Sequence, residues 1–204
     1  MDMGLNRLQN AIVDMAGLAQ ESVMKAIQAY TKGEKITQEA LKRANELSML
    51  ASEVDELAVE LLARYQPVAT DLRFIKSCLE IAYGFSRFGR YAWDIAQVLE
   101  IYGDLSECDK SIVEDLSIKV SKMIQTSIES FKTRDTKLAR SLRLEDDQVD
   151  KIYIDYNKQL AKGAKVSIEC ALTSVLVLRY LERIADHACY IGDSVIYITT
   201  ATKA

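Results

Sequence analysis

The chain has 204 residues, a hydrophobic share of 49%, a charged share of 27% and a net charge of −4, which is the balance of an ordinary soluble globular protein. This length suffices for one good-sized core or for two small cores packed together. One proline and eight glycines are too few for the turns of an all-β or α/β fold, so the composition favours an all-α protein. The Lys and Arg residues are scattered and form no basic patch, so nucleic acid is not an expected partner.

Neither a membrane span nor a signal peptide is expected. The longest uncharged runs near the C-terminus, CALTSVLVL and SVIYITTAT, have nine residues each, whereas a membrane-spanning helix needs about 18. The N-terminal MDMGLNRLQN lacks the charged-then-apolar pattern of a secretory signal, which predicts a cytoplasmic protein. The cysteines show no C-x-x-C spacing and are predicted to be small buried side chains in a reducing compartment, not a zinc site: Cys78, Cys108, Cys170 and Cys189.

Apolar residues recur at helical spacing along almost the whole chain, without strand-like alternation. Gly33 ends the first helical segment, and Pro67 suits the first turn of the third, where its fixed φ is tolerated. Ser106 and Asp109 have the spacing of a capping box at the start of the fourth. The pattern predicts six helices, over residues 4–31, 36–64, 68–102, 107–132, 135–161 and 164–199.

The two halves of the chain match each other in order. The segment LAQESVMKAIQAYTKGE (18–34) aligns with KVSKMIQTSIESFKTRD (119–135), and SEVDEL (52–57) aligns with DQVDKI (147–152). A third match joins LEIAYGFSRFGRYAWDIA (79–96) to VLVLRYLERIADHACYIG (175–192). Three matches in the same order indicate an internal duplication, with two tandem three-helix bundles over residues 1–104 and 105–204.

Two pairs of acidic residues lie one helical turn apart in the second half. Asp146 and Asp150 fall on the fifth predicted helix, and Glu182 and Asp186 fall on the sixth. Side chains at i and i+4 share a helix face, and two carboxylates so placed repel each other unless a cation lies between them. Because the fifth and sixth helices would be antiparallel neighbours, these carboxylates predict a site for a hard cation such as iron, manganese or magnesium.

Spacing alone does not decide in favour of a metal. The chain holds four such acid pairs, about as many as its 30 acidic residues would give at random. Arg183 precedes Asp186 by three residues, so the two could pair on a solvated, salt-bridged face. His187 follows Asp186 but points about 100° away from it around the helix, and it is predicted to be a partly buried neighbour and not a ligand.

Two segments carry a resemblance to a known family. QPVATDLRFI (66–75) and LERIADHACYIGDS (181–194), with Val-Asp pairs at 54–55 and 149–150 before them, resemble the signature segments of the PhoU family of phosphate-uptake regulators. The resemblance covers essentially the whole chain. It implies two three-helix bundles, acidic motifs that bind multinuclear metal clusters, and a regulatory, non-enzymatic role.

The resemblance also implies partners. PhoU-like proteins restrain the high-affinity phosphate ABC transporter and the phosphate-responsive kinase signalling coupled to it. The implied partners are therefore the ATPase subunit of that transporter, a sensor histidine kinase and a second copy of the chain. Membranes would be contacted only through these protein partners.

The family's acidic motif matches only the second half of this chain. The match implies one metal ion or small cluster, with iron expected first and manganese, zinc or magnesium as alternatives, held by Asp146, Asp150, Glu182 and Asp186. The corresponding positions of the first half have lost three of the four acids and are Ala51, Asp55, Ser86 and Arg90. We therefore expect no second metal site, and we predict that Arg90 pairs with Asp55 in the space that a metal would fill.

The predicted function is regulation by binding, because the sequence contains no nucleophile–base pattern and no glycine-rich phosphate loop. Two alternatives remain open. A ferritin-like di-iron enzyme needs Glu-x-x-His on two helices, whereas this chain has no Glu-x-x-His and only one histidine. A metal-free helical adaptor for another transporter or signalling partner would leave the acidic pairs as solvated faces.

Overall fold

The computed structural model describes residues 1–202 and contains, within them, six helices and no strand. The all-α prediction is confirmed. The predicted ranges agree within two residues, except that α4 and α6 each begin four residues later than predicted. The helices are α1 (Asp2–Lys32), α2 (Thr37–Tyr65), α3 (Ala69–Tyr102), α4 (Ser111–Thr133), α5 (Thr136–Ala161) and α6 (Ile168–Thr200).

Local hydrogen bonds explain the late start of α4. The backbone N–H groups of Ser106 and Ser111 donate to the carboxylates of Asp104 and Asp109, each at 2.9 Å, and such contacts fold a connection into turns. The predicted capping box of Ser106 and Asp109 is therefore wrong. The residue before the helix, Lys110, makes no side-chain cap.

Side-chain caps begin α5 and α6 but not α3. Pro67 lies before α3, whose N-cap is Val68, and not in the first turn of that helix as predicted. Asp135 caps α5 by accepting hydrogen bonds from two backbone N–H groups. Ser167 caps α6 by accepting from the N–H of Cys170, so the residues before it belong to the connection.

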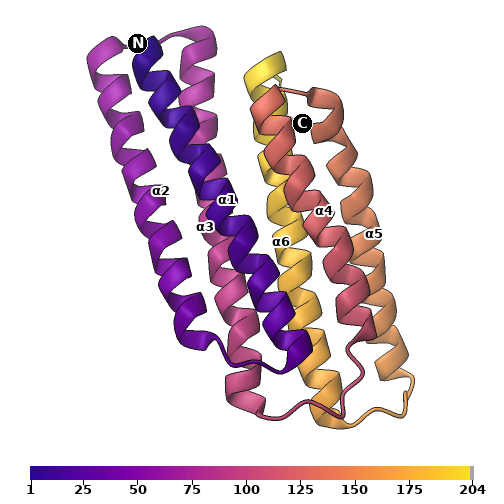
Figure 1. Cartoon of the computed structure of the whole chain (residues 1–204). Coiled ribbons are helices and arrows are strands. Elements are labelled where there is room, and N and C mark those ends of the chain that lie inside the picture. The colour runs from indigo at the N-terminus through magenta and orange to yellow at the C-terminus, as the bar shows by residue number, and fades with distance from the viewer. Residues whose placement is uncertain (203–204) are drawn as a thin grey trace.

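The helices form two three-helix bundles side by side, α1–α3 and α4–α6 (Figure 1). α3 and α6 lie against each other along the middle of the molecule, and α1 also contacts α4. The central pair is antiparallel, since Lys76 of α3 lies over Tyr197 of α6 while Tyr91 further along α3 stacks on Tyr180. α2 and α5 occupy the outer sides.

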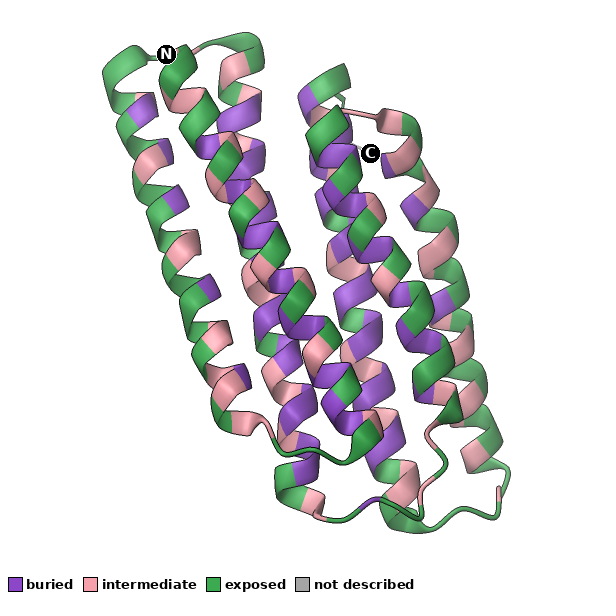
Figure 2. Ribbon diagram, viewed as in Figure 1, coloured by how far each residue is buried: buried purple, intermediate pink, exposed green. Residues whose placement is uncertain are grey.

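Burial follows this arrangement (Figure 2). Sixteen residues of α3 and sixteen of α6 are buried, against five of α2 and three of α5. The buried apolar side chains of both bundles form one continuous core. The central helices are therefore the rigid elements, and the functional side chains that they carry are held in fixed positions.

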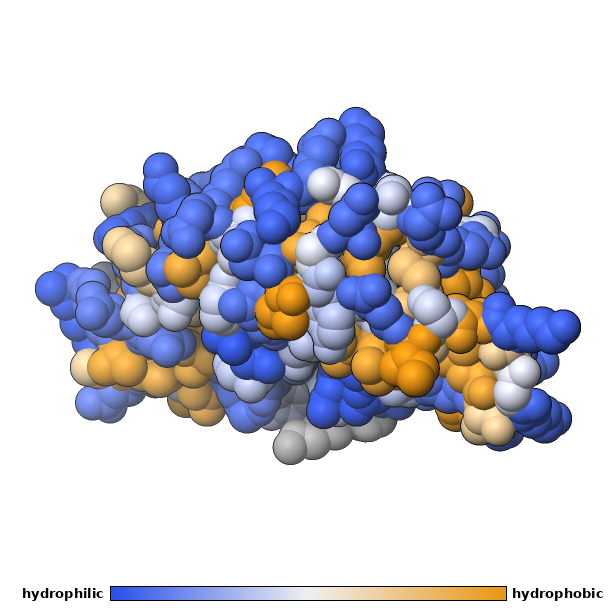
Figure 3. Space-filling view, turned by 90° about the horizontal axis from the view of Figure 1, so that it is seen from below, coloured by the Kyte–Doolittle hydropathy of each residue, from blue (hydrophilic) through white to orange (hydrophobic). Residues whose placement is uncertain are grey.

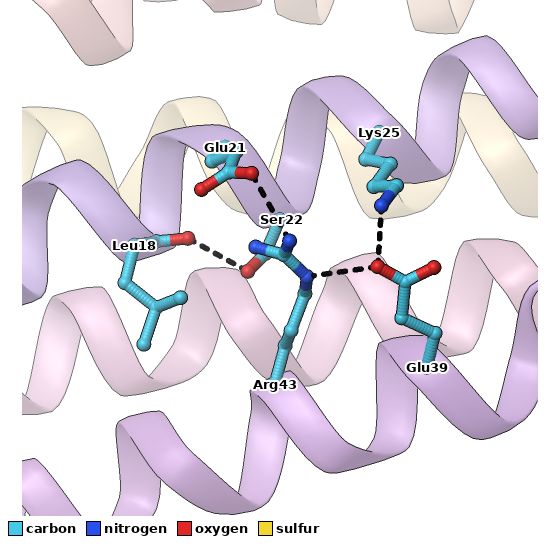
Figure 4. Close-up of polar contacts among 6 residues, drawn as sticks. All are labelled: Leu18, Glu21, Ser22, Lys25, Glu39 and Arg43. Carbon is cyan, nitrogen blue, oxygen red and sulfur yellow. Dashed lines mark hydrogen bonds and ion pairs between the residues drawn. The ribbon is translucent and has the colours of Figure 1, made fainter.

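Charged side chains link α2 to α1 along their exposed edge (Figure 4). Arg43 of α2 donates from Nη2 to Glu21 Oε1 at 3.0 Å and from Nε to Glu39 Oε1 at 3.3 Å, and Lys25 of α1 pairs with the same Glu39. A network with shared partners contributes more than isolated surface pairs do. It helps to hold α2, which buries only a narrow apolar stripe.

Two of the four cysteines form a disulfide. Cys108 and Cys170 are bonded, with their Cα atoms 5.3 Å apart, so the prediction of four reduced, buried cysteines is wrong for this pair. Cys108 lies in the connection between α3 and α4, and Cys170 lies in the first turn of α6. These two segments are far apart in the chain and meet only in the folded molecule. Cys78 and Cys189 are free and buried, as predicted.

The end of the molecule where α3 joins α4 and α5 joins α6 has a mostly hydrophilic surface, with apolar side chains in separate groups (Figure 3). Ile101 near the end of α3 and Ile168 at the start of α6 are among the exposed apolar residues of the chain. Between residues 1 and 202, no helix is both long enough and apolar enough to cross a membrane.

Candidate functional site

The fold places the four predicted carboxylates on α5 and α6, two helices that pack against each other. Asp150 and Asp186 both raise the pKa of Asp146, and the same two carboxylates raise the pKa of Glu182. Charges on different helices affect each other in this way only when they lie close in space. We call Asp146, Asp150, Glu182 and Asp186 the acidic cluster.

Burial is the largest influence on this cluster. It raises the pKa of Asp146 to about 6 and that of Glu182 to about 7. Glu182 is only 8% exposed. One oxygen of each side chain, Asp146 Oδ1 and Glu182 Oε2, is buried and has no hydrogen-bond partner among residues 1–202. Buried carboxylate oxygens without donors are unfavourable, and a cation beside them would relieve that penalty.

Arginines supply positive charge on the outer side of the cluster. Arg179 Nη1 pairs with Glu182 Oε1, and Arg183 Nη1 lies 4.0 Å from Asp186 Oδ2, as the spacing of Arg183 and Asp186 predicted. Among the side chains of residues 1–202, no three Asp, Glu, His or Cys residues are grouped closely enough to hold a metal ion. Metal binding would therefore require the carboxylates to draw together, and Glu182 could offer Oε2 while Oε1 stays on Arg179.

The corresponding positions of the first repeat do not form the predicted ion pair. Arg90 pairs with Asp94, one turn along the same helix, with Nε 3.3 Å from Oδ1, and its guanidinium lies over the Trp93 ring. Asp55 is exposed on α2. The prediction of an Arg90–Asp55 pair is wrong because a partner at i+4 is reached without bridging two helices.

His187 faces α3 and not the acidic cluster. Its ring stacks on Tyr91 at 5.8 Å between centroids and meets the edge of Tyr83 at 6.0 Å. Burial, with a smaller contribution from the charges of Arg87 and Arg183, lowers the pKa of His187 to about 4. The side chain is a neutral, half-buried aromatic group of the α3–α6 contact, in agreement with the prediction that it is partly buried.

A groove of about 720 Å³ lies between α3 and α6 beside His187. Tyr83 and Tyr190 are 60% and 61% exposed there. Its charged groups are already paired, because Glu80 accepts from Lys76 and from Ser194 Oγ and Asp193 pairs with an arginine of α5. The lining residues are Lys76, Leu79, Glu80, Tyr83, Gly84, His187, Tyr190, Asp193, Ser194 and Tyr197.

No pattern in the sequence points to this groove. Its tyrosines lie on two helices that are about 100 residues apart in the chain, so no local pattern marks them as one surface. The available signal was the repeat alignment, which places the third and sixth predicted helices at equivalent positions. That alignment does not say that the two helices pack against each other.

The fold and the acidic cluster together define a duplicated three-helix-bundle protein with a candidate ligand site in one repeat. The model of the PhoU domain family matches residues 12–99 and 113–195, which cover most of both bundles. The chain therefore belongs to the PhoU family, and the resemblance seen in its two signature segments is confirmed.

Full-length relatives and solved structures agree with this assignment. The phosphate-specific transport system accessory protein PhoU homolog 1 of Methanothermobacter thermautotrophicus is 28% identical over 97% of this chain and 94% of its own length. The crystal structure of PhoU from Pseudomonas aeruginosa matches with a TM-score of 0.89 at 28% identity, covering 98% of this chain and 99% of that one. The phosphate transport system regulatory protein PhoU of Streptococcus pneumoniae, at 20% identity and a TM-score of 0.89 over 100% and 98% of the two chains, has the same fold.

Proposed function

We propose that this protein is a cytoplasmic regulator of phosphate uptake and of phosphate-responsive signalling, which acts by binding and not by catalysis. The observation that carries the proposal is the match of the PhoU domain to both repeats, supported by relatives named as accessory proteins of phosphate-specific transport systems. The proposed partners are the ATPase subunit of the phosphate ABC transporter, a phosphate-responsive sensor histidine kinase and a second copy of this chain.

The acidic cluster is the proposed metal site, with iron as the first candidate and manganese, zinc or magnesium as alternatives. Carboxylate oxygens are suitable donors for such cations, and two of those present are buried without hydrogen-bond partners. A bound cation would supply positive charge between α5 and α6 and would cross-link them. Glu182 and Asp146 would then give up the protons that burial favours.

A metal-free adaptor is the second candidate function. The observation that favours it is the neutralisation of the cluster by arginine, since Arg179 pairs with Glu182 and Arg183 contacts Asp186. The two candidates differ in the metal content of protein purified without chelator, compared with an Asp150→Asn/Asp186→Asn variant. Metal in the parent protein that is lost from the variant supports the metal site. A parent that is metal-free and cannot be reloaded with iron, manganese or zinc supports the adaptor.

The regulatory proposal is tested by affinity capture of the tagged protein from its native cells, grown with abundant phosphate and under phosphate starvation. We expect enrichment of a phosphate-transporter ATPase or a sensor kinase that changes with phosphate supply. Clean capture without either partner in both conditions would contradict the proposal. Sedimentation analysis tests the second copy, because a dimer has twice the 22.9 kDa mass of the chain.

A further inference from the structure

The Cys108–Cys170 disulfide lies where the chain passes from one repeat to the other. Cys108 is in the 103–110 connection, which is the covalent link between α3 and α4, and Cys170 is in the first turn of α6. The bond therefore ties the link between the repeats directly to a central helix of the second repeat. Both residues are half-buried at the end of the molecule, not enclosed in its core.

Three elements meet beside this disulfide. Lys110 of the connection donates from Nζ to the backbone carbonyl of Thr31 at the end of α1, at 3.2 Å, and lies 5.5 Å from the centroid of the Tyr30 ring. Tyr30 is fully buried, and its hydroxyl lies beside Thr173 of α6, about one turn after Cys170. Lys110 therefore joins the connection to the end of α1, next to the Tyr30 side chain that reaches α6.

The fold itself does not require this bond. The buried apolar side chains already form one continuous core through both bundles, and a chain of 204 residues is well above the size at which disulfides become necessary for folding. In the cytoplasm, where the proposed function places this protein, disulfides are in most cases transient and redox-sensing. This step rests on the proposed function.

The two remaining cysteines are poorly suited to exchange with the pair. Burial raises the pKa of the Cys78 thiol to about 12 and also raises that of Cys189. The thiolate is the attacking species in disulfide exchange, so neither buried residue supplies it at neutral pH. Oxidation of this chain should therefore be confined to Cys108 and Cys170.

We propose that Cys108 and Cys170 form a reversible oxidation site, which clamps the connection between the repeats to α6 when oxidised and releases it when reduced. The oxidant is a disulfide-bearing molecule, either a small disulfide such as oxidised glutathione or a disulfide oxidoreductase. One protein thiolate attacks the oxidant and releases one thiolate, and the second attacks the resulting mixed disulfide and releases another. The protein loses two electrons and two protons, and the oxidant is reduced to two thiols.

The test uses the purified full-length chain equilibrated in buffers of increasing ratio of oxidised to reduced glutathione, followed by acid quenching, alkylation and mass spectrometry. We expect Cys108 and Cys170 to change together between alkylated and linked forms, reversibly, while Cys78 and Cys189 never become linked. A pair that stays unlinked in the most oxidising buffer would overturn the proposal. So would a pair that stays linked in the most reducing one, because the bond would then be permanent.

Hydrogen exchange provides the conformational readout. Reduction should speed amide exchange in residues 103–110 and in the first turns of α6 by at least several-fold, and it should lower the Tm by roughly 10 °C. A Cys108→Ser/Cys170→Ser variant should match the reduced protein under all conditions, whereas Cys78→Ala should keep the redox response. Equal exchange in the oxidised and reduced forms would overturn the clamp. These measurements use only the purified protein, without a transporter or kinase partner. A failure of the affinity-capture experiment would therefore not change their outcome.

Discussion

The Glu182 and Asp146 side chains lie on facing helices, and the fold buries both carboxylates. Their pKa values are raised in the folded state, to about 7 and about 6, above the values near 4 of an unfolded chain. Between about pH 4 and pH 7, the folded protein therefore binds more protons than the unfolded protein does. The stability that these protonated groups contribute is fully present below about pH 4 and is lost as the pH rises through 6 and 7.

We expect this loss to depend on Glu182. In metal-free protein, Glu182→Gln should flatten the fall in the free energy of unfolding between pH 4 and 7 and should leave the variant about 1–2 kcal/mol more stable than the parent at pH 7.5. Urea unfolding followed by circular dichroism measures this. Asp155→Asn is the matched control, since Asp155 is exposed on α5. Parallel pH profiles of the parent and Glu182→Gln would contradict the expectation.

His187 is the only histidine of the chain, so its imidazole gives a single set of NMR signals. Burial and the charges of Arg87 and Arg183 place its pKa at about 4, and we expect the ring to titrate with a midpoint near that value. Arg87→Gln should raise the midpoint by removing one repulsive charge, while Arg64→Gln on α2 should leave it unchanged. A midpoint near the ordinary 6.5 would show that the ring is solvated and is not packed between α3 and α6.

Between elements, the approach of α6 to α5 depends on Gly192. A Cβ atom at that position would lie 3.0 Å from the Ala139 carbonyl oxygen and 2.8 Å from a methyl group of Leu142. Because the carbonyl belongs to the backbone of α5, it cannot move aside as a flexible side chain can. Gly192→Ala should therefore destabilise the protein by about 1–3 kcal/mol, measured by urea unfolding.

Gly17 is the control for this substitution. It lies on the exposed face of α1, and a Cβ atom there would meet nothing within 4 Å. Gly17→Ala should stabilise the protein by about 0.5–1 kcal/mol through helix propensity alone. Two Gly→Ala substitutions in the same fold thus have opposite expected signs. Stabilisation by both would mean that α5 and α6 are not closely packed at Gly192.

The groove between α3 and α6 is the surface that we expect partner capture to depend on. Tyr83 and Tyr190 are exposed there, and tyrosine is favoured at binding hot spots because it combines a large apolar area with few rotatable bonds. Tyr83→Ser/Tyr190→Ser should reduce capture of the phosphate-transporter ATPase or sensor kinase at least tenfold. Tyr65→Ser should not reduce it, because Tyr65 is exposed outside the groove. Unchanged capture by the double variant would place the contact on another face.

The helices themselves were largely predictable, because their apolar periodicity is local. The start of α4 was not, since Asp104 and Asp109 bind backbone groups of a connection and so compete with the predicted capping box. For the site, the four acidic residues follow from the sequence and the family resemblance. The contact of Arg183 with Asp186 also follows from their i,i+3 spacing, and Arg179 and Glu182 have the same spacing. The Cys108–Cys170 bond, in contrast, depends on which segments meet in space and leaves no local pattern.

In the whole molecule, the antiparallel contact of α3 with α6 makes two similar bundles into one body. The contact is made by the most buried helix of each repeat, so the core runs through the boundary between the repeats. A cation bound between α5 and α6 would therefore stiffen a helix that also forms this boundary. In this way the first repeat, which has lost most of its acidic motif, would still be affected by cation binding in the second repeat.

The disulfide also changes how the polypeptide is connected. It turns residues 108–170 into a covalent ring with two tails, so α6 no longer depends on the 162–167 segment for its attachment.

Lys162 and Lys165 are exposed in the 162–167 segment, where trypsin should cut first. Oxidised protein cut there should run as one band of about 22.9 kDa on a non-reducing gel and as two fragments after reduction. Two fragments without reductant would show that the ring is not closed. A closed ring would let the protein survive a break in its backbone with all six helices still joined.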